Sequence, residues 1–209
     1  MEENGHKFLY VNPEKCLGCS LCEYACSLEK TEEFNPLTSR IRVVRIHPFV
    51  NVALTCKMCD NPPCVKACPT ECLSQTKESG VINVDNEKCT GCRWCIEACP
   101  YGAIQYDEDT GAVAICDLCD GKPECIDICP TEAIEFSSSV EDVKIKWAGA
   151  QKSWTEESKK FMRMAEGEKI DIFADSTKNM EKIEEKLELL CQKKTQINEA
   201  KKHQNPSCT

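Results

Sequence analysis

The stretch CTGCRWCIEACP, residues 89–100, decides how this chain folds. Three cysteines stand three positions apart, a fourth follows four positions later, and a proline comes next. Gly91 precedes the second cysteine and permits the positive φ angle that a tight backbone curl requires. Because Cys95 and Cys99 are four residues apart, they lie on one face of a helical turn. The stretch therefore predicts a loop that wraps three thiols around one centre and a short helix that holds the fourth thiol.

Sixteen of the nineteen cysteines belong to four such runs. The first run resembles the third and the second resembles the fourth, which indicates an internal duplication. Longer spacers precede Cys64 and Cys125, but each run still holds four cysteines. The four runs are Cys16, Cys19, Cys22 and Cys26; Cys56, Cys59, Cys64 and Cys68; Cys89, Cys92, Cys95 and Cys99; and Cys116, Cys119, Cys125 and Cys129.

This spacing is typical of iron–sulfur ligands. The bacterial ferredoxin run supplies three thiolates to one [4Fe–4S] cluster and the fourth to a neighbouring cluster, and a proline follows. Pro69, Pro100 and Pro130 match that ending, whereas the first run ends in Cys26-Ser27. Structural zinc sites use separated pairs of cysteines and often histidine, and disulfide frameworks suit short secreted chains. The sequence therefore predicts four [4Fe–4S] clusters that move single electrons.

Several residues remain outside this scheme. Cys72 occupies a position that is alanine in the two parallel segments, so a small buried hydrophobe is favoured there over a spare ligand. Cys191 and Cys208 are expected to be free thiols in the tail. No phosphate-binding loop or dinucleotide fingerprint is present, and we expect no catalytic site. The three histidines are scattered and are expected at the surface or in loops: His6, His47 and His203.

Composition limits the possible partners and location. The net charge is −9 over 209 residues, which argues against nucleic acid, since that partner requires a basic face. No apolar run approaches the ~20 residues of a membrane span, and the N-terminus lacks the features of a signal peptide. We therefore expect a cytoplasmic protein.

The spacing of apolar residues predicts an α+β fold. Short strands are expected at residues 8–11, 41–46, 50–54 and 80–84, and a hairpin at 103–106 and 112–115. Residues 1–139 are expected to form one four-cluster domain of duplicated bacterial-ferredoxin-like modules, in which short antiparallel strands and one-turn helices surround the clusters. Its two pseudo-repeats span about 8–72 and 80–136. From spacing alone, the first run pairs either with the second or with the fourth.

Residues 140–209 are expected to form a helical extension after a linker at 137–139. One helix is predicted from Thr155, its N-cap, to Glu166, and a second from Asn179 to Lys202. The second helix either packs back on the body or docks on a larger subunit, and docking is favoured. Residues 203–209 are expected to be disordered. The apolar positions expected on one face of the second helix are Met180, Ile183, Leu187, Leu190, Cys191 and Ile197.

Over residues 8–136 the four runs resemble the four-cluster, ferredoxin-like electron-transfer subunits of bacterial and archaeal oxidoreductases. These include the beta-type subunits of dimethyl sulfoxide reductase and formate dehydrogenase, which are molybdopterin enzymes. Similar small subunits accompany tungsten aldehyde oxidoreductase-type enzymes, including class II benzoyl-CoA reductases, and carbon monoxide dehydrogenases.

The resemblance implies an accessory subunit without catalytic activity. It would relay electrons between a tungsten- or molybdenum-pterin catalytic subunit and an external donor or acceptor, such as a soluble ferredoxin, or a second redox module. The alternatives are a subunit of a carbon monoxide dehydrogenase or hydrogenase complex, and a free polyferredoxin.

The resemblance also implies a nested pairing of the runs. Trp94, inside the third run, would act as a lid that excludes water. Lys57 and Arg93 lie within ligand loops, where they either raise two cluster potentials or are exposed charges with little effect. The implied ligand sets are Cys16, Cys19, Cys22 and Cys129; Cys116, Cys119, Cys125 and Cys26; Cys56, Cys59, Cys64 and Cys99; and Cys89, Cys92, Cys95 and Cys68.

Overall fold

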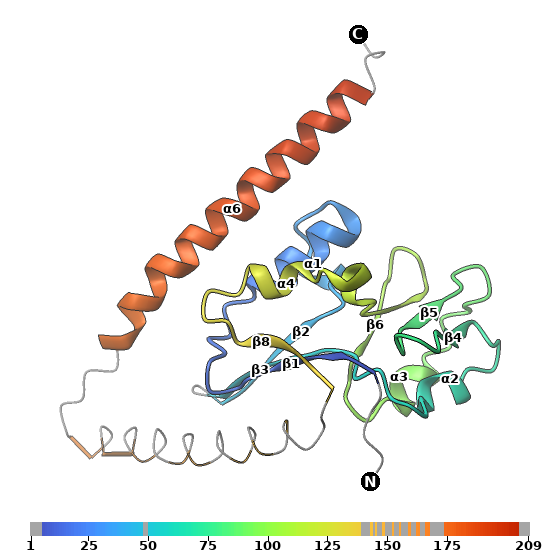
Figure 1. Cartoon of the computed structure of the whole chain (residues 1–209), viewed down its shortest axis with the longest axis horizontal. Coiled ribbons are helices and arrows are strands. Elements are labelled where there is room, and N and C mark those ends of the chain that lie inside the picture. Colours follow the sequence, from blue (N-terminus) through green and yellow to red (C-terminus); the bar gives the residue numbers. More distant parts are fainter. Residues whose placement is uncertain are drawn as a thin grey trace.

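The chain folds into four antiparallel two-stranded sheets connected by short helices (Figure 1). The computed structural model describes residues 6–47, 50–138 and 174–204, together with single residues between 143 and 167. The predicted α+β arrangement of short antiparallel strands and short helices is confirmed. The sheets pair β1 (Phe8–Val11) with β8 (Ile134–Ser137), β2 (Arg42–His47) with β3 (Val50–Leu54), β4 (Leu73–Gln75) with β5 (Ile82–Val84), and β6 (Ile104–Tyr106) with β7 (Val113–Ile115).

The pairing of β1 with β8 joins the two ends of the four-run segment. Phe8 lies opposite Ser137, and Val11 lies opposite Ile134. Because of this pairing, the first run lies beside the fourth run. The hairpins β4–β5 and β6–β7 lie together at the other end of the body (Figure 1). Of the two pairings that spacing left open, the fold brings the first run together with the fourth.

Proline determines the lengths of the helices that hold the cysteines. Ser27 follows Cys26, and α1 continues to Thr31. In the other three runs a proline follows the last cysteine, which removes a backbone donor and disfavours helix at the preceding residue. The expectation of one-turn helices is therefore wrong for the first run. The helices before the tail are α1 (Leu21–Thr31), η1 (Pro36–Thr38), α2 (Pro63–Lys66), α3 (Trp94–Ala98), η2 (Leu118–Gly121) and α4 (Glu124–Asp127), and all of them except η1 contain cysteines of the runs.

The buried core is small and contains many of the cysteines. Leu9 and Tyr10 of β1 are almost fully buried and belong to a cluster that also includes Cys22, Cys26 and Cys116. A second cluster, around the hairpins β4–β5 and β6–β7, includes Cys64 and Cys95. Thiols therefore occupy interior positions that larger apolar side chains fill in most domains.

A long helix, α6 (Ala174–Gln204), packs on the body instead of standing free. Leu190 is 3% exposed and contacts the cluster formed by α1 and α4, where Ile183 and Ile197 are partly buried. Lys193 approaches the carboxylates of Glu29 at 3.4 Å and Glu124 at 2.9 Å. Of the two possibilities raised by the sequence, the apolar face packs back on the body. That face is narrower than predicted, because Met180, Leu187 and Cys191 are exposed.

The segment before α6 is described only in part. Thr155 is helical, as are Lys152 before it and Lys159 after it, so the prediction of Thr155 as an N-cap is wrong. Residues 205–209, part of the tail predicted to be disordered, lie outside the described residues. Among the helices of the described segments, none is long and apolar enough to cross a membrane.

Candidate iron–sulfur sites

Four groups of four cysteines come together from distant parts of the chain. In three groups, a single pocket is lined by all four side chains. In the remaining group, Cys68 and Cys89 pack against the core cluster that contains Cys95, and Cys68 and Cys92 act electrostatically on Cys95. We name them the first quartet (Cys16, Cys19, Cys22 and Cys129), the second quartet (Cys26, Cys116, Cys119 and Cys125), the third quartet (Cys56, Cys59, Cys64 and Cys99) and the fourth quartet (Cys68, Cys89, Cys92 and Cys95). That each quartet ligates iron stays a prediction.

The last two cysteines of every run belong to different quartets. In α1, Cys22 belongs to the first quartet and Cys26 to the second, and the fourth run repeats this link with Cys125 and Cys129. The second and third runs join the third quartet to the fourth in the same way. Between these two halves, the thiol of Cys56 acts electrostatically on that of Cys116. The quartets therefore follow one another in the order first, second, third and fourth.

The ligand loops share one backbone feature. The residue before the second cysteine has a positive φ in all four runs: 66° at Gly18, 46° at Met58, 64° at Gly91 and 61° at Leu118. In three runs the backbone N–H of this residue acts to lower the pKa of the first cysteine, against the larger effect of burial. The tight backbone curl expected at Gly18 and Gly91 therefore also forms at Met58 and Leu118. The sequence analysis did not predict it at these two bulky residues. Their alignment with the glycines of the related runs was the available signal.

Burial keeps most of these thiols protonated when no metal is bound. Burial is the largest cause that raises the pKa of Cys56 and of Cys116, each to about 12, with smaller contributions from neighbouring thiols. The pKa values of Cys22 and Cys125 are raised well above the ordinary value for the same reason. Metal ligation requires thiolates, so the charge of the metal must offset the free energy of deprotonating these buried thiols.

The chemistry of the quartets fits an iron–sulfur cluster. Beside its four thiols, the pocket of the first quartet is lined mainly by apolar residues such as Val11, Val43 and Ile134. Within the described part of the chain, no three His, Cys, Asp or Glu side chains meet closely enough to hold a single metal ion. The four thiols of the first quartet instead line a common pocket. A [4Fe–4S] cluster, held by four thiolates and tuned by backbone N–H groups, has these requirements.

The two basic residues within ligand loops have different surroundings. Lys57 is partly buried: its Nζ donates to the carbonyl oxygen of Leu9 at 3.0 Å and lies 5.2 Å from the centre of the Phe8 ring. Burial lowers the pKa of Lys57 to about 8, although the nearby Cys56 and Cys116 act in the opposite direction. Arg93 is exposed and stacks over Tyr106 at 4.0 Å. Of the two, only Lys57 presents a partly buried charge that interacts with two quartets.

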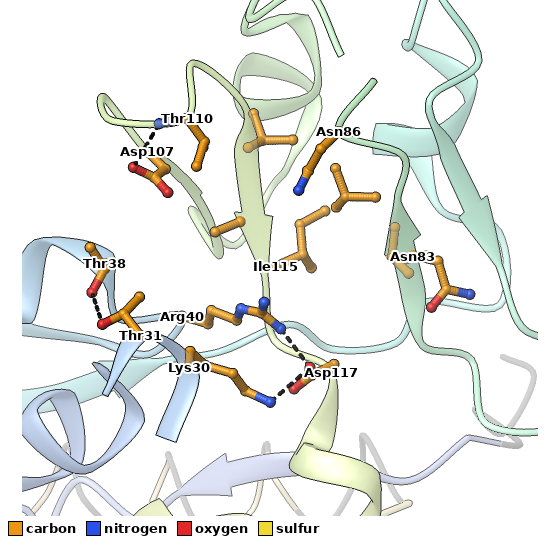
Figure 2. A pocket seen from close by; sticks show the side chains of 14 residues that line it. Lys30, Thr31, Thr38, Arg40, Asn83, Asn86, Asp107, Thr110, Ile115 and Asp117 are labelled. Atoms are coloured by element: carbon orange, nitrogen blue, oxygen red, sulfur yellow. Dashed lines mark hydrogen bonds and ion pairs between the residues drawn. The ribbon is translucent and has the colours of Figure 1, made fainter. Parts of the chain in front are cut away.

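An ionic cluster lies next to the second quartet. Lys30 and Arg40 both bind the same carboxylate oxygen of Asp117, at 2.8 and 2.5 Å (Figure 2). The backbone N–H of Arg40 also donates to the sulfur of Cys26 at 3.3 Å. The three charged side chains line a pocket of about 420 Å³ between α1 and the hairpins β4–β5 and β6–β7. Sequence reasoning missed this cluster, because its members lie far apart in the chain.

The fourth quartet is the most open to solvent. Among the sixteen cysteines of the quartets, only Cys92 is exposed. The neighbouring Trp94 is 60% exposed, and its role as a lid that excludes water stays a prediction. A cluster held here would lie closest to the surface.

The remaining cysteines and His6 have distinct surroundings. Cys72 is buried as predicted, at 5% exposure, and its sulfur lies 3.3 Å from that of Cys68. Cys191 is an exposed free thiol, and Cys208 lies outside the described residues. His6 is partly buried, and its two ring nitrogens lie 3.2 Å from the carbonyl oxygen of Met58 and 3.1 Å from that of Lys77.

Comparisons with known proteins agree with this chemistry. Residues 49–139 match the 4Fe-4S dicluster domain family, and residues 13–30 match a 4Fe-4S binding domain. The chain is 45% identical over 116 residues to the polyferredoxin-like subunit of aliphatic sulfonate oxidoreductase from Pyrococcus furiosus, covering 56% of this chain and 67% of the relative. It is 32% identical over 128 residues to the B subunit of anaerobic dimethyl sulfoxide reductase from Escherichia coli, covering 53% of this chain and 60% of the relative.

A solved structure is also similar. The active site complex BamBC of benzoyl coenzyme A reductase matches with a TM-score of 0.37 and 26% identity, covering 63% of this chain and 78% of the matched chain.

These sequence matches define an iron–sulfur protein that binds 4Fe–4S clusters. The chain belongs to the family of polyferredoxin-like electron-transfer subunits that includes the subunit from Pyrococcus furiosus. The predictions of iron–sulfur cofactors and of an electron-transfer role are thereby confirmed. The chain spans about two thirds of the length of this relative and less of the Escherichia coli relative.

Proposed function

We propose that this chain relays single electrons between a tungsten- or molybdenum-pterin catalytic subunit and an external donor or acceptor, or a second redox module. Four [4Fe–4S] clusters, each held by one quartet, would form the path. The observation that carries the proposal is the sharing of every run between two neighbouring quartets, since clusters linked through one short helix lie close together.

The ends of the path have different surroundings. The first quartet lies beside the pairing of β1 with β8, and the fourth quartet reaches the surface at Cys92. Electrons would enter at one end and leave at the other. The potential of each cluster would depend on its burial, on the hydrogen bonds to its sulfurs and on nearby charge.

The choice of partner is supported by the relatives. One relative is named as a subunit of an aliphatic sulfonate oxidoreductase, and another belongs by name to an anaerobic dimethyl sulfoxide reductase. We infer that the present chain likewise serves a large catalytic subunit. We place this work in the cytoplasm, where reducing conditions keep thiols available for metal.

Anaerobic purification of the untagged protein from its own cells tests this function. We expect a complex with a large subunit that contains tungsten or molybdenum, and about sixteen irons per copy of this chain. Dithionite should bleach its visible absorption. Nickel in the complex would instead indicate a carbon monoxide dehydrogenase or hydrogenase, and an isolated monomer would indicate a free polyferredoxin. A much lower iron content would refute the four-cluster assignment itself.

A further inference from the structure

Cys72 contacts the fourth quartet as a fifth thiol. Its side chain is 5% exposed, and its Sγ atom lies 3.3 Å from the Sγ of Cys68. Both residues are free thiols, and a disulfide would need ~2.05 Å between the two sulfurs. Cys89, which comes from a different run, also acts electrostatically on Cys72. Two runs therefore bring sulfur ligands to the neighbourhood of this one side chain.

The related runs show what normally occupies this place. Ala133 and Ala103 lie four residues after Cys129 and Cys99, as Cys72 lies four residues after Cys68, and both alanines are 1% exposed. The backbone N–H of Ala133 donates to the sulfur of Cys129 at 3.2 Å. This position of the repeat thus lies against the last sulfur of the run. At the fourth quartet, it supplies a second sulfur where the first and third quartets have a methyl group.

We propose that Cys72 is an exchangeable ligand of the fourth cluster and can take the coordination position of Cys68. The exchange forms an iron–sulfur bond to Cys72 and breaks the bond to Cys68. The proton released by the Cys72 thiol passes to the departing Cys68 thiolate, so no electron is gained or lost. The two sulfurs are already in contact, so the exchange needs only side-chain rotation. The inference rests on the proposed function in one respect, namely that the fourth quartet holds a cluster.

The position of the fifth thiol explains what it contributes. Cys92 of the fourth quartet is the one exposed cysteine among the sixteen of the quartets, and its loop has the exposed indole of Trp94. A cluster open to solvent is the one most subject to loss of a ligand or an iron. When the bond between iron and Cys68 breaks, the buried thiol of Cys72 keeps that iron atom coordinated.

Replacement of single ligands in the full chain, expressed and purified anaerobically, tests the proposal. In Cys68→Ala we expect about sixteen irons per chain and no electron paramagnetic resonance signal of a three-iron cluster. Cys99→Ala is the matched control, because Ala103 provides no fifth thiol at the third quartet. It should lose between about one and four irons, as a three-iron cluster or an empty site. The double variant Cys68→Ala/Cys72→Ala should behave as Cys99→Ala does.

Two further variants separate ligation from folding. Cys72→Ala alone should keep all four clusters, since Cys68 remains. Cys99→Ala with Ala103→Cys should regain the iron that Cys99→Ala loses, because the transplanted thiol repeats the arrangement of Cys72. The proposal is overturned if Cys68→Ala loses as much iron as Cys99→Ala, or if Cys72→Ala itself loses a cluster. A low iron content in the unmodified chain would instead count against the proposed function.

Discussion

At the scale of single residues, the charge of Lys57 is placed to influence two clusters. Its side chain is partly buried, and its ammonium group interacts with thiols of the second and third quartets. In Lys57→Met, we expect the reduction potentials of both clusters to fall, because a positive charge favours the reduced, more negative state. A partly shielded charge is worth on the order of 1 kcal/mol, which corresponds to about 40 mV for one electron. Redox titration followed by electron paramagnetic resonance measures the shift.

Arg93 provides the matched control for Lys57. It also lies inside a ligand loop, but it is exposed and stacks over Tyr106. Water and salt screen such a charge, so Arg93→Met should shift the potential of the fourth cluster by much less. Equal shifts in the two variants would show that burial does not determine the effect of these charges.

The residue scale also shows the limit of prediction from the sequence. The cysteine spacing predicted four runs of candidate iron ligands, whose role as ligands stays a prediction, and Gly18 and Gly91 predicted the curled loops. The same left-handed backbone at Met58 could not be predicted from its residue type, because bulky residues adopt it only where surrounding contacts stabilise it. The side chain of Met58 is fully buried, and that packing is a property of the tertiary structure.

Gly91 should tolerate a methyl group less well than the other loop glycines. A Cβ at Gly91 would lie 2.6 Å from the backbone oxygen of Gly111, whereas one at Gly18 would meet the side chain of Asn51. Both positions have a positive φ, which costs an L-residue ~1–2 kcal/mol. We expect Gly91→Ala to lower the free energy of unfolding by about 2–4 kcal/mol, since overpacking adds to this strain.

Anaerobic denaturant unfolding, followed by cluster absorbance, measures these effects. Gly111→Ala is the control for strain alone, because its φ is +68° and no atom lies within 4 Å of a Cβ placed there. It should cost about 1–2 kcal/mol, and Gly18→Ala should fall between the two because the Asn51 side chain can rotate. If Gly91→Ala is no worse than Gly111→Ala, the backbone contact has no energetic effect.

At the scale of elements, the absence of a proline after Cys26 determines how the body contacts the tail helix α6. Ser27 in place of proline lets α1 extend to Thr31, and the longer helix presents Leu21, Ala25 and Leu28 to α6. We expect Leu190→Ala to weaken the docking of α6 by about 2–3 kcal/mol, because it removes a buried side chain from this contact. Hydrogen exchange in α6 should accelerate, while the iron content stays unchanged.

Leu189→Ala is the control for this docking prediction. Leu189 is adjacent to Leu190 but is 47% exposed, so its loss should change hydrogen exchange in α6 very little. If both variants speed the exchange equally, helix propensity and not docking controls the stability of α6.

Elements that are local in the sequence were predicted better than those that depend on distant partners. The hairpin β6–β7 follows from alternation and a turn between adjacent segments, and it forms as expected. The pairing of β1 with β8 joins residues more than 120 positions apart, and no local pattern specifies it. The packing of α6 also depends on a partner surface, so a helical pattern could show the helix but not which of its faces is covered.

At the scale of the whole molecule, the quartets tie together segments that the thin apolar core does not hold. The first quartet joins Cys16 to Cys129, and the second joins Cys26 to Cys116. Because the quartets do not exist in the unfolded chain, the free energy of cluster binding adds to the stability that the apolar contacts provide. We therefore expect oxidative removal of iron with a chelator to unfold residues 8–137 and to release α6, which docks on the helix that carries Cys22 and Cys26. Far-ultraviolet circular dichroism and hydrogen exchange should show loss of protection in both parts, and anaerobic reconstitution with iron and sulfide should restore it. Retention of native-like protection in the iron-free protein would mean that the apolar core alone holds the fold.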